Sequence, residues 1–184
     1  MGQLRIIGGE WRGRMLSTPT GLDTRPLTNR IRQSLFDCLG QRLDGYVVAD
    51  CCAGSGSFGF EALSRGAASV YAIESGAPAI ACLRHNAHSL SCAADHHLIT
   101  TPLPAGCHQL PECDLIFCDP PFPWYREQPE LLQATIEAAV QQLAPDGILL
   151  LRGERGQTLP PHFLPQQQQQ RQYGRSWVSW IAPG

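Results

Sequence analysis

The chain has 184 residues, of which 43% are hydrophobic and 16% charged, so it can bury a core and fold as one compact domain. Its formal net charge of -2 excludes a protein that binds nucleic acid through a strong overall positive charge. No apolar run reaches the length of a membrane span, and the first residues lack the apolar stretch of a secretion signal. We therefore expect a cytoplasmic protein whose eight cysteines are reduced thiols.

Arginines gather near the N-terminus, although the chain as a whole is slightly acidic. Within residues 1–32 they are opposed only by Glu10 and Asp23, and the chain contains no lysine. A local cluster of cations is typical of a surface that contacts RNA phosphates, and an ordinary solvated face is the alternative. We predict an RNA-binding arm with contacts from Arg5, Arg12, Arg14, Arg25, Arg30 and Arg32.

The first part of the chain is expected to form an extension ahead of an α/β body. Leu4 to Leu16 indicate two short strands joined by a glycine turn, and a connection rich in Pro, Gly and Asp follows from Thr18 to Pro26. Helical spacing of apolar residues then predicts a helix from Thr28 to Leu39, with its first residue as the cap. We divide the chain into an extension of residues 1–43 and a main domain of residues 44–184.

Beyond residue 44, short apolar segments alternate with segments of helical periodicity. The apolar segments predict strands over Tyr46–Asp50, Ser69–Ile73, His97–Thr101, Asp114–Cys118, Ile148–Leu151 and Trp177–Ile181. Helices are expected up to about Arg65, from Pro78 to about Leu90, and over Glu130–Leu143, whereas Gln166–Gln170 is expected to be a loop. Apolar strands that alternate with helices predict an α/β fold with a doubly wound, mostly parallel sheet covered on both faces.

A glycine-rich turn follows the first strand of the body. In the stretch Asp50 to Gly59, Gly54, Gly56 and Gly59 match the pattern G-x-G-x-x-G, and Glu74 ends the next strand. Such glycines let the backbone approach a ligand closely, and a carboxylate at the second strand end can accept two ribose hydroxyls. This turn alone fits NAD as well as S-adenosylmethionine, and a tight turn without a ligand is the remaining alternative.

A second turn, Asp119-Pro120-Pro121-Phe122, favours S-adenosylmethionine. Its two prolines have no N–H donors, so the turn offers acceptor oxygens. A carboxylate and a carbonyl beside an aromatic ring suit a flat base that carries an amine, because the ring stacks and the oxygens accept N–H bonds. A hydride-transfer enzyme needs no such turn. We predict that Asp119, Pro120, Pro121 and Phe122 form the methyl-acceptor site, with a rigid surface turn as the alternative.

Together these segments resemble the bacterial 16S ribosomal RNA guanine-N2 methyltransferase family. The similarity lies in Ala53–Ala67, Arg5–Arg14, Arg25–Arg32 with Leu35-Phe36, Asp119–Phe122 and Tyr173-Gly174, which span almost the whole chain. The resemblance implies a Rossmann-like methyltransferase sheet of seven strands with an N-terminal hairpin and helix. It also implies S-adenosylmethionine as methyl donor, N2-methylguanine as product, and 16S ribosomal RNA or the small ribosomal subunit as partner. We expect a monomer.

By position, the expected cofactor site consists of Asp50, Ala53, Gly54, Ser55, Gly56, Glu74 and Thr101. The family tends to place an acid or amide after the third strand to read the adenine, but here only Thr101 or the backbone could do so. Arg152 stands where the family often has an acid, and Asn29 where it often has Asp. These departures leave open a divergent substrate or a weakened enzyme.

Other functions remain open. A non-catalytic RNA-binding or ribosome-assembly protein could keep the fold and lose the cofactor, and an amino-methyltransferase could act on adenine. DNA-methylating enzymes usually carry an added recognition domain, for which 184 residues leave no room. No metal is expected, because no standard spacing of zinc ligands is present in the group Cys82, His85, His88, Cys92, His96 and His97.

Overall fold

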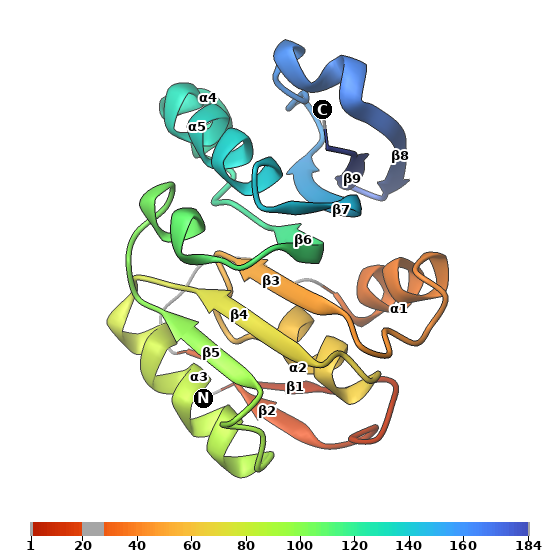
Figure 1. Ribbon diagram of the computed structural model, residues 1–184, viewed down its shortest axis with the longest axis vertical. Coiled ribbons are helices and arrows are strands. Elements are labelled where there is room, and N and C mark those ends of the chain that lie inside the picture. Colours follow the sequence, from red (N-terminus) through yellow and green to blue (C-terminus); the bar gives the residue numbers. More distant parts are fainter. Residues whose placement is uncertain (1, 20–27, 184) are drawn as a thin grey trace.

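The computed structural model describes residues 2–19 and 28–183. Arg25, one of the expected RNA contacts, and most of the expected connection from Thr18 to Pro26 lie outside these residues. An antiparallel hairpin of β1 (Gln3–Arg5) and β2 (Met15–Ser17) comes first, and a larger sheet forms the body (Figure 1). The expected strands around a glycine turn are therefore present, although their connection is longer than a tight turn.

The large sheet has seven strands in the order β5-β4-β3-β6-β7-β9-β8. Their bounds are β3 Val47–Cys51, β4 Ser69–Ile73, β5 His96–Ile99, β6 Cys113–Cys118, β7 Leu143–Glu154, β8 Gln167–Tyr173 and β9 Ser176–Ile181. The strands from β5 to β7 pair in parallel, whereas β9 is antiparallel to both of its neighbours. From β3 the chain continues through β4 to β5 on one side of the sheet, and from β6 it continues through β7 on the other side. This confirms the predicted doubly wound, mostly parallel sheet of seven strands.

Helices cover both faces of this sheet. The first face carries α1 (Asn29–Cys38), α2 (Ser57–Ser64) and α3 (Ala77–Ser89), and the second carries α4 (Trp124–Glu127), α5 (Pro129–Val140) and the 3-10 turns η1 (Ala105–Gln109) and η2 (Pro161–Gln166). In β6, Leu115 and Phe117 enter the core of the first face, and Ile116 and Cys118 enter that of the second. Burial on both faces explains the continuous apolar pattern of the strands. Along the described segments, none of the helices has the length and apolar character needed to cross a membrane.

The N-terminal extension shares the core of the body. The Phe58 ring stacks on Phe36 of α1 and on Phe117 of β6, with centroid distances of 5.0 Å and 4.1 Å. Ile6 from the hairpin is fully buried in the same cluster. The predicted cap of α1 is confirmed, because the Thr28 hydroxyl accepts a bond from the Ile31 N–H at 3.3 Å. The extension thus packs against the sheet and shares its apolar core, and is not connected to it by the chain alone.

Glu61 in α2 holds the hairpin to the body through a buried network. The residue is fully buried. Its Oε2 accepts a bond from the Ile7 N–H at 2.9 Å, and its Oε1 accepts one from the Arg65 guanidinium at 2.9 Å. The Nε of the fully buried Arg32 lies 3.7 Å from Oε2. One carboxylate therefore faces two buried cations and accepts a bond from a hairpin N–H group.

The hairpin also approaches the C-terminal end of α2 very closely. The Ser64 carbonyl accepts a bond from the Glu10 N–H at 2.7 Å, and its hydroxyl accepts one from the Trp11 N–H at 2.9 Å. Gly9 has a φ of +73°, and a Cβ atom there would lie 1.8 Å from the Ser64 carbonyl oxygen. Only glycine fits this contact, so the glycine pair is required by packing against α2 as well as by the turn.

Two predictions of secondary structure are wrong. The glutamine tract expected to be a loop is the edge strand β8, which pairs along its length with β9. Its side chains are mostly exposed, so no apolar alternation marks it as a strand. The helix expected over Glu130–Leu143 ends at Val140, and Leu143 instead opens β7 opposite Cys113. In both cases the structure of the segment depends on pairing with a distant strand. The local pattern of apolar residues does not predict that pairing.

Candidate active site

A pocket of about 960 Å³ opens at the carboxyl ends of β3 and β6. Its wall includes residues of the glycine-rich turn, Glu74, and all four residues of the turn Asp119–Phe122. The two turns meet because β3 and β6 are hydrogen-bonded neighbours, and the Asp119 N–H donates to the Cys51 carbonyl at 3.3 Å. This is the switch point of the sheet, where ligands bind in open α/β folds.

The three glycines of the first turn have different reasons to be glycine. A Cβ atom on Gly54 would meet only the Cys52 carbonyl, at 3.9 Å, so this position leaves room for a ligand. A Cβ on Gly56 would lie 2.6 Å from Leu83, and one on Gly59 would lie 2.8 Å from Val70. Gly54 and Gly56 also have positive φ values of +56° and +73°. Gly56 and Gly59 are therefore needed for the close packing of α2. Gly54 instead leaves space in the pocket.

Asp50, the residue before this turn, supports it from inside. Its carboxylate Oδ2 accepts a bond from the Gly59 N–H at 3.0 Å, and only 2% of the residue is exposed. Burial, together with the nearby charges of Asp119 and Glu74, raises the pKa of Asp50 to about 8, and the bond from Gly59 opposes the shift. Ala53, Ser55 and Gly54 follow along the pocket wall. All these expected cofactor residues except Gly56 line the pocket, and Gly56 packs behind it.

Glu74 is fixed at the pocket by the backbone. Its Oε2 accepts a bond from the Gly54 N–H at 2.9 Å, and its Oε1 accepts one from the Gly76 N–H at 2.7 Å. A carboxylate has about four acceptor sites, so two remain for ribose hydroxyls. The structure thus brings together the two parts of the first motif that the sequence placed on consecutive strands.

Thr101 is not part of the pocket wall. Its hydroxyl accepts a bond from the Gln109 side chain at 2.6 Å, and the wall in this region is formed by Pro102 and Leu103. The expectation of a polar side chain that reads adenine does not point to these two apolar residues. Their position directly after the third strand of the body is the sequence feature that indicates a place in the pocket. An apolar wall suits an aromatic ring.

The turn Asp119–Phe122 presents its carboxylate to the pocket. The Asp119 side chain is 21% exposed, and its Oδ2 accepts a bond from Arg152 Nη1 at 2.8 Å. Burial raises the pKa of Asp119, and the Arg152 cation opposes this shift. The Pro121 carbonyl accepts a bond from the Trp124 N–H at 2.9 Å, whereas the Phe122 carbonyl accepts one from Gln157 at 2.8 Å. Contacts on both sides therefore hold the turn in place.

Two arginines of the predicted RNA arm have structural contacts. Arg32 is fully buried, and its guanidinium donates to the carbonyls of Arg5 and Ser57 and to the Asn29 side chain. Burial lowers the pKa of Arg32, with the charge of Glu61 opposing the shift. The predicted RNA contact of Arg32 is therefore wrong, because RNA cannot reach a fully buried side chain. Exposed Arg14 donates to the Ser89 carbonyl at the end of α3.

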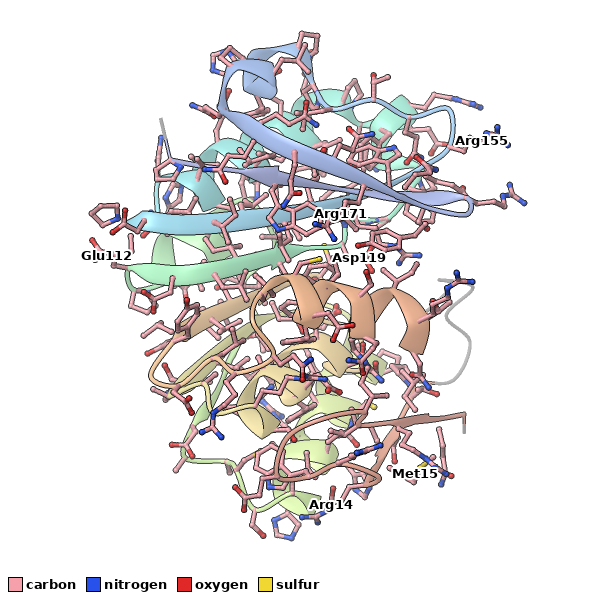
Figure 2. The ribbon with its side chains drawn as sticks, turned by 90° about the vertical axis from the view of Figure 1, so that its right-hand side faces the viewer. Arg14, Met15, Glu112, Asp119, Arg155 and Arg171 are labelled. Carbon is pink, nitrogen blue, oxygen red and sulfur yellow. The ribbon has the colours of Figure 1, made fainter. Side chains whose placement is uncertain are left out.

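The other described arm residues, Arg5, Arg12 and Arg30, are exposed. Figure 2 shows Arg14 on the hairpin at the lower end of this view, with Asp119 between it and Arg155 at the upper end. Across residues 2–19 and 28–183, no group of three or more His, Cys, Asp or Glu side chains could hold a metal ion. The eight cysteines are free thiols.

Comparison with known proteins relates the whole chain to one family. A family model described as "Conserved hypothetical protein 95" matches residues 4–181. Ribosomal RNA small subunit methyltransferase D of Escherichia coli (strain K12) is 34% identical over 161 residues, which cover 86% of this chain and 79% of the relative. The chain belongs to the ribosomal RNA small subunit methyltransferase D family. This confirms the family that the sequence motifs indicated.

Other members agree with this family in sequence and in structure. The YlbH protein of Bacillus subtilis is 30% identical over 161 residues, which cover 85% of this chain and 86% of that protein. The solved structure of yhhF from Escherichia coli has a TM-score of 0.80 and 30% identity, with both chains covered completely. HI0767 from Haemophilus influenzae has a TM-score of 0.78 and 28% identity over 99% of each chain. The fold is therefore the Rossmann-like methyltransferase fold of this family.

The chain is a methyltransferase, and its methyl donor is S-adenosylmethionine. The pocket fits this cofactor: Gly54 leaves space for close backbone contact, and Glu74 is held where ribose hydroxyls can reach it. Pro102 and Leu103 add an apolar surface that suits an adenine ring. When bound, S-adenosylmethionine supplies an electrophilic methyl group. We expect the glycine-rich turn to contact the remaining part of S-adenosylmethionine, beyond its adenine and ribose.

Replacing Glu74 with Ala is expected to weaken the binding of S-adenosylhomocysteine by about 1.5–3 kcal/mol, the range for charge-assisted hydrogen bonds. The variant loses both the acceptors for ribose and the support of the Gly54 N–H. Calorimetry on the purified protein measures the difference. Glu112→Ala is the matched control, since Glu112 is exposed and lies just before the start of β6, away from Asp119 in Figure 2. Equal affinities of Glu74→Ala and the wild type would remove Glu74 from the site.

Proposed function

We propose that this chain methylates the exocyclic N2 amine of a guanine in 16S ribosomal RNA. The observation that carries the proposal is the common pocket of the glycine-rich turn and the turn Asp119–Phe122. Relatives named as ribosomal RNA small subunit methyltransferase D support ribosomal RNA of the small subunit as the substrate. We propose further that the protein acts as a monomer in the bacterial cytoplasm, on naked RNA or on the assembled subunit.

The acceptor turn suits the chemistry of a guanine amine. This amine is a poor nucleophile, because its lone pair is delocalised into the ring. Bonds from its two N–H groups to the Asp119 carboxylate and the Pro120 carbonyl would favour a pyramidal nitrogen with a localised lone pair. The Phe122 ring offers a surface on which the base stacks. The methylated nitrogen is cationic and loses a proton easily, so Asp119 acts mainly by orienting the amine.

We propose that residues 1–43 supply RNA contacts to a main domain of residues 44–184 that carries the reaction. Arg5, Arg12 and Arg30 are exposed on this extension, and Arg25 remains a candidate from sequence. Contacts with phosphates depend on salt, because each releases condensed counterions. Deleting the hairpin would remove the buried Ile6 and Leu16 from the core, so point variants test the arm better than a truncation.

Replacing Arg12 or Arg30 with Ala is expected to weaken RNA binding and to flatten its salt dependence. The slope of log affinity against log salt should fall by about 0.7–0.9 for each phosphate that the variant no longer neutralises. Titrations of a 16S ribosomal RNA fragment at several salt concentrations measure it, with Arg84→Ala on the exposed side of α3 as control. If both arm variants keep the wild-type affinity and slope, the RNA is held elsewhere.

Nucleoside analysis of cells tests the proposed function. Small-subunit RNA from a strain without this chain should lack one N2-methylguanosine that mass spectrometry finds in the parent strain. Restoring the wild-type chain should restore the nucleoside, whereas Asp119→Ala should not. Loss of N6-methyladenosine instead would assign the enzyme to adenine, and an unchanged set of nucleosides would favour a non-catalytic role in RNA binding or ribosome assembly.

A further inference from the structure

The Arg152 side chain is built into the wall of the acceptor pocket. Strands β6 and β7 pair in parallel with Cys118 opposite Leu151, so the next residues, Asp119 and Arg152, leave the sheet together. Arg152 Nη1 donates to Asp119 Oδ2 at 2.8 Å, and its side chain is only 4% exposed. Its guanidinium carbon lies 5.1 Å from the centre of the Phe122 ring. A single buried cation thus contacts both the carboxylate and the ring proposed to hold the base.

Further contacts fix Arg152 in this place. Its Nη2 donates to the hydroxyl of buried Ser176 in β9 at 3.2 Å. Its carbonyl accepts a bond from the Tyr125 hydroxyl at 2.8 Å. Both the guanidinium and the backbone of Arg152 are therefore held by hydrogen bonds where the side chain lines the pocket.

We propose that Arg152 is a positioning residue for methyl transfer, which keeps the Asp119 carboxylate charged and directed at the base. The inference rests on the proposed function, because it assigns a role within the same pocket. A carboxylate has about four acceptor sites on two oxygens. The bond from Arg152 occupies one site on Oδ2, so acceptor capacity remains for the amine of the base.

The surroundings of Asp119 explain why a cation is needed. Burial raises the pKa of this carboxyl group, and protonation would replace an acceptor with a donor. Among the described residues, the acids Asp50, Cys52, Cys118 and Tyr125 interact electrostatically with Asp119. Glu74, Glu154 and Arg175 line the same pocket. The four groups that interact with Asp119 are acids, which are neutral or negative at every pH, so none of them offers a compensating positive charge. Arg152 provides that charge from β7.

The test uses the complete protein with Asp labelled by carbon-13 at the carboxyl group, and Asp119→Asn to assign the signal. In Arg152→Gln the titration midpoint of Asp119 should rise by about 1–3 pH units, the usual effect of an adjacent arginine. The acid limb of kcat for methyl transfer should move upward by a similar amount, so that activity recovers as the pH rises. KM for S-adenosylmethionine should stay near that of the wild type. Arg152→Lys should restore the midpoint but only part of kcat, because an amine cannot reach Asp119 and Ser176 together.

An equal Asp119 midpoint in wild type and Arg152→Gln overturns the proposal. A Gln variant that is faster than wild type at every pH also overturns it, because Arg152 would then compete with the base. If Arg152→Gln does not fold, Arg152→Lys decides: a wild-type kcat contradicts positioning, and a lower kcat at an unchanged midpoint supports it. A wild-type protein that methylates no RNA contradicts the proposed function, while the titration still decides whether Arg152 holds the charge of Asp119.

Discussion

Replacing Asp119 with Ala is expected to lower the turnover of methyl transfer by about 100-fold or more, the scale of losing a preorganised group that acts in the transition state. Its hydrogen bond to the amine strengthens as the nitrogen becomes pyramidal, so the loss falls on turnover more than on binding. Binding of S-adenosylhomocysteine should change little, because Glu74 and the glycine-rich turn are held by their own contacts.

Single-turnover transfer of labelled methyl groups to RNA, together with calorimetry, separates these two effects. Asp146→Ala is the matched control, since Asp146 is an exposed aspartate. A variant that keeps the wild-type turnover and loses only affinity for RNA would show that Asp119 binds the substrate without assisting the reaction. Normal kinetics in both respects would remove Asp119 from the acceptor site.

Replacing Glu61 with Ala is expected to reduce the free energy of unfolding by about 3–5 kcal/mol, the usual cost of removing one partner of a buried ion pair. The change leaves the guanidinium groups of Arg32 and Arg65 buried without their carboxylate and removes the acceptor of the Ile7 N–H. Urea unfolding followed by circular dichroism measures the loss. Glu10→Ala in the same hairpin is exposed and should change stability by only about 0.5 kcal/mol.

A loss of less than about 1 kcal/mol in Glu61→Ala would mean that apolar packing, rather than this network, holds the hairpin. Glu61→Gln distinguishes the two contributions of the carboxylate. The amide keeps an acceptor for the Ile7 N–H but removes the charge that faces the two arginines. Stability near that of the alanine variant would therefore assign the main effect to charge.

The sequence could place the glycine-rich turn and Glu74 beside one another because their signals are local. Gly54 follows β3 and Glu74 follows β4, and the bond from the Gly54 N–H to Glu74 joins them at the carboxyl ends of these two neighbouring strands. The acceptor turn after Cys118 was equally visible as a motif. Its meeting with the first turn depended on β3 and β6 being neighbours, which only the topology of the sheet decides.

The parts that sequence reasoning missed depend on distant partners. Arg32 belongs to a local arginine cluster, and nothing nearby reveals that Glu61 accompanies it in the core. Its neighbour Arg30, two residues earlier, is exposed. In the sequence Arg152 is only a departure from the family pattern, because its ion pair with Asp119 depends on the pairing of β6 with β7.

Buried Asn86 in α3 connects the N-terminal extension to the cofactor turn. Its Nδ2 donates to the carbonyls of Ser17, at the end of the hairpin, and Ser55, in the glycine-rich turn, at 3.0 Å and 3.1 Å. Its Oδ1 accepts a bond from the Ser17 N–H at 2.9 Å. The segment proposed to contact RNA is thus joined directly to the backbone that would surround the cofactor.

Methylation of small ribosomal subunits by the purified protein tests directly whether this chain modifies the N2 amine of a guanine. Subunits and naked 16S ribosomal RNA from a strain lacking this chain are incubated with labelled S-adenosylmethionine, and the labelled nucleoside is identified by mass spectrometry. We expect N2-methylguanosine with the wild-type protein and its loss with Asp119→Ala. A protein that binds the cofactor but labels neither substrate, or that produces N6-methyladenosine, would contradict guanine-N2 methylation by this chain.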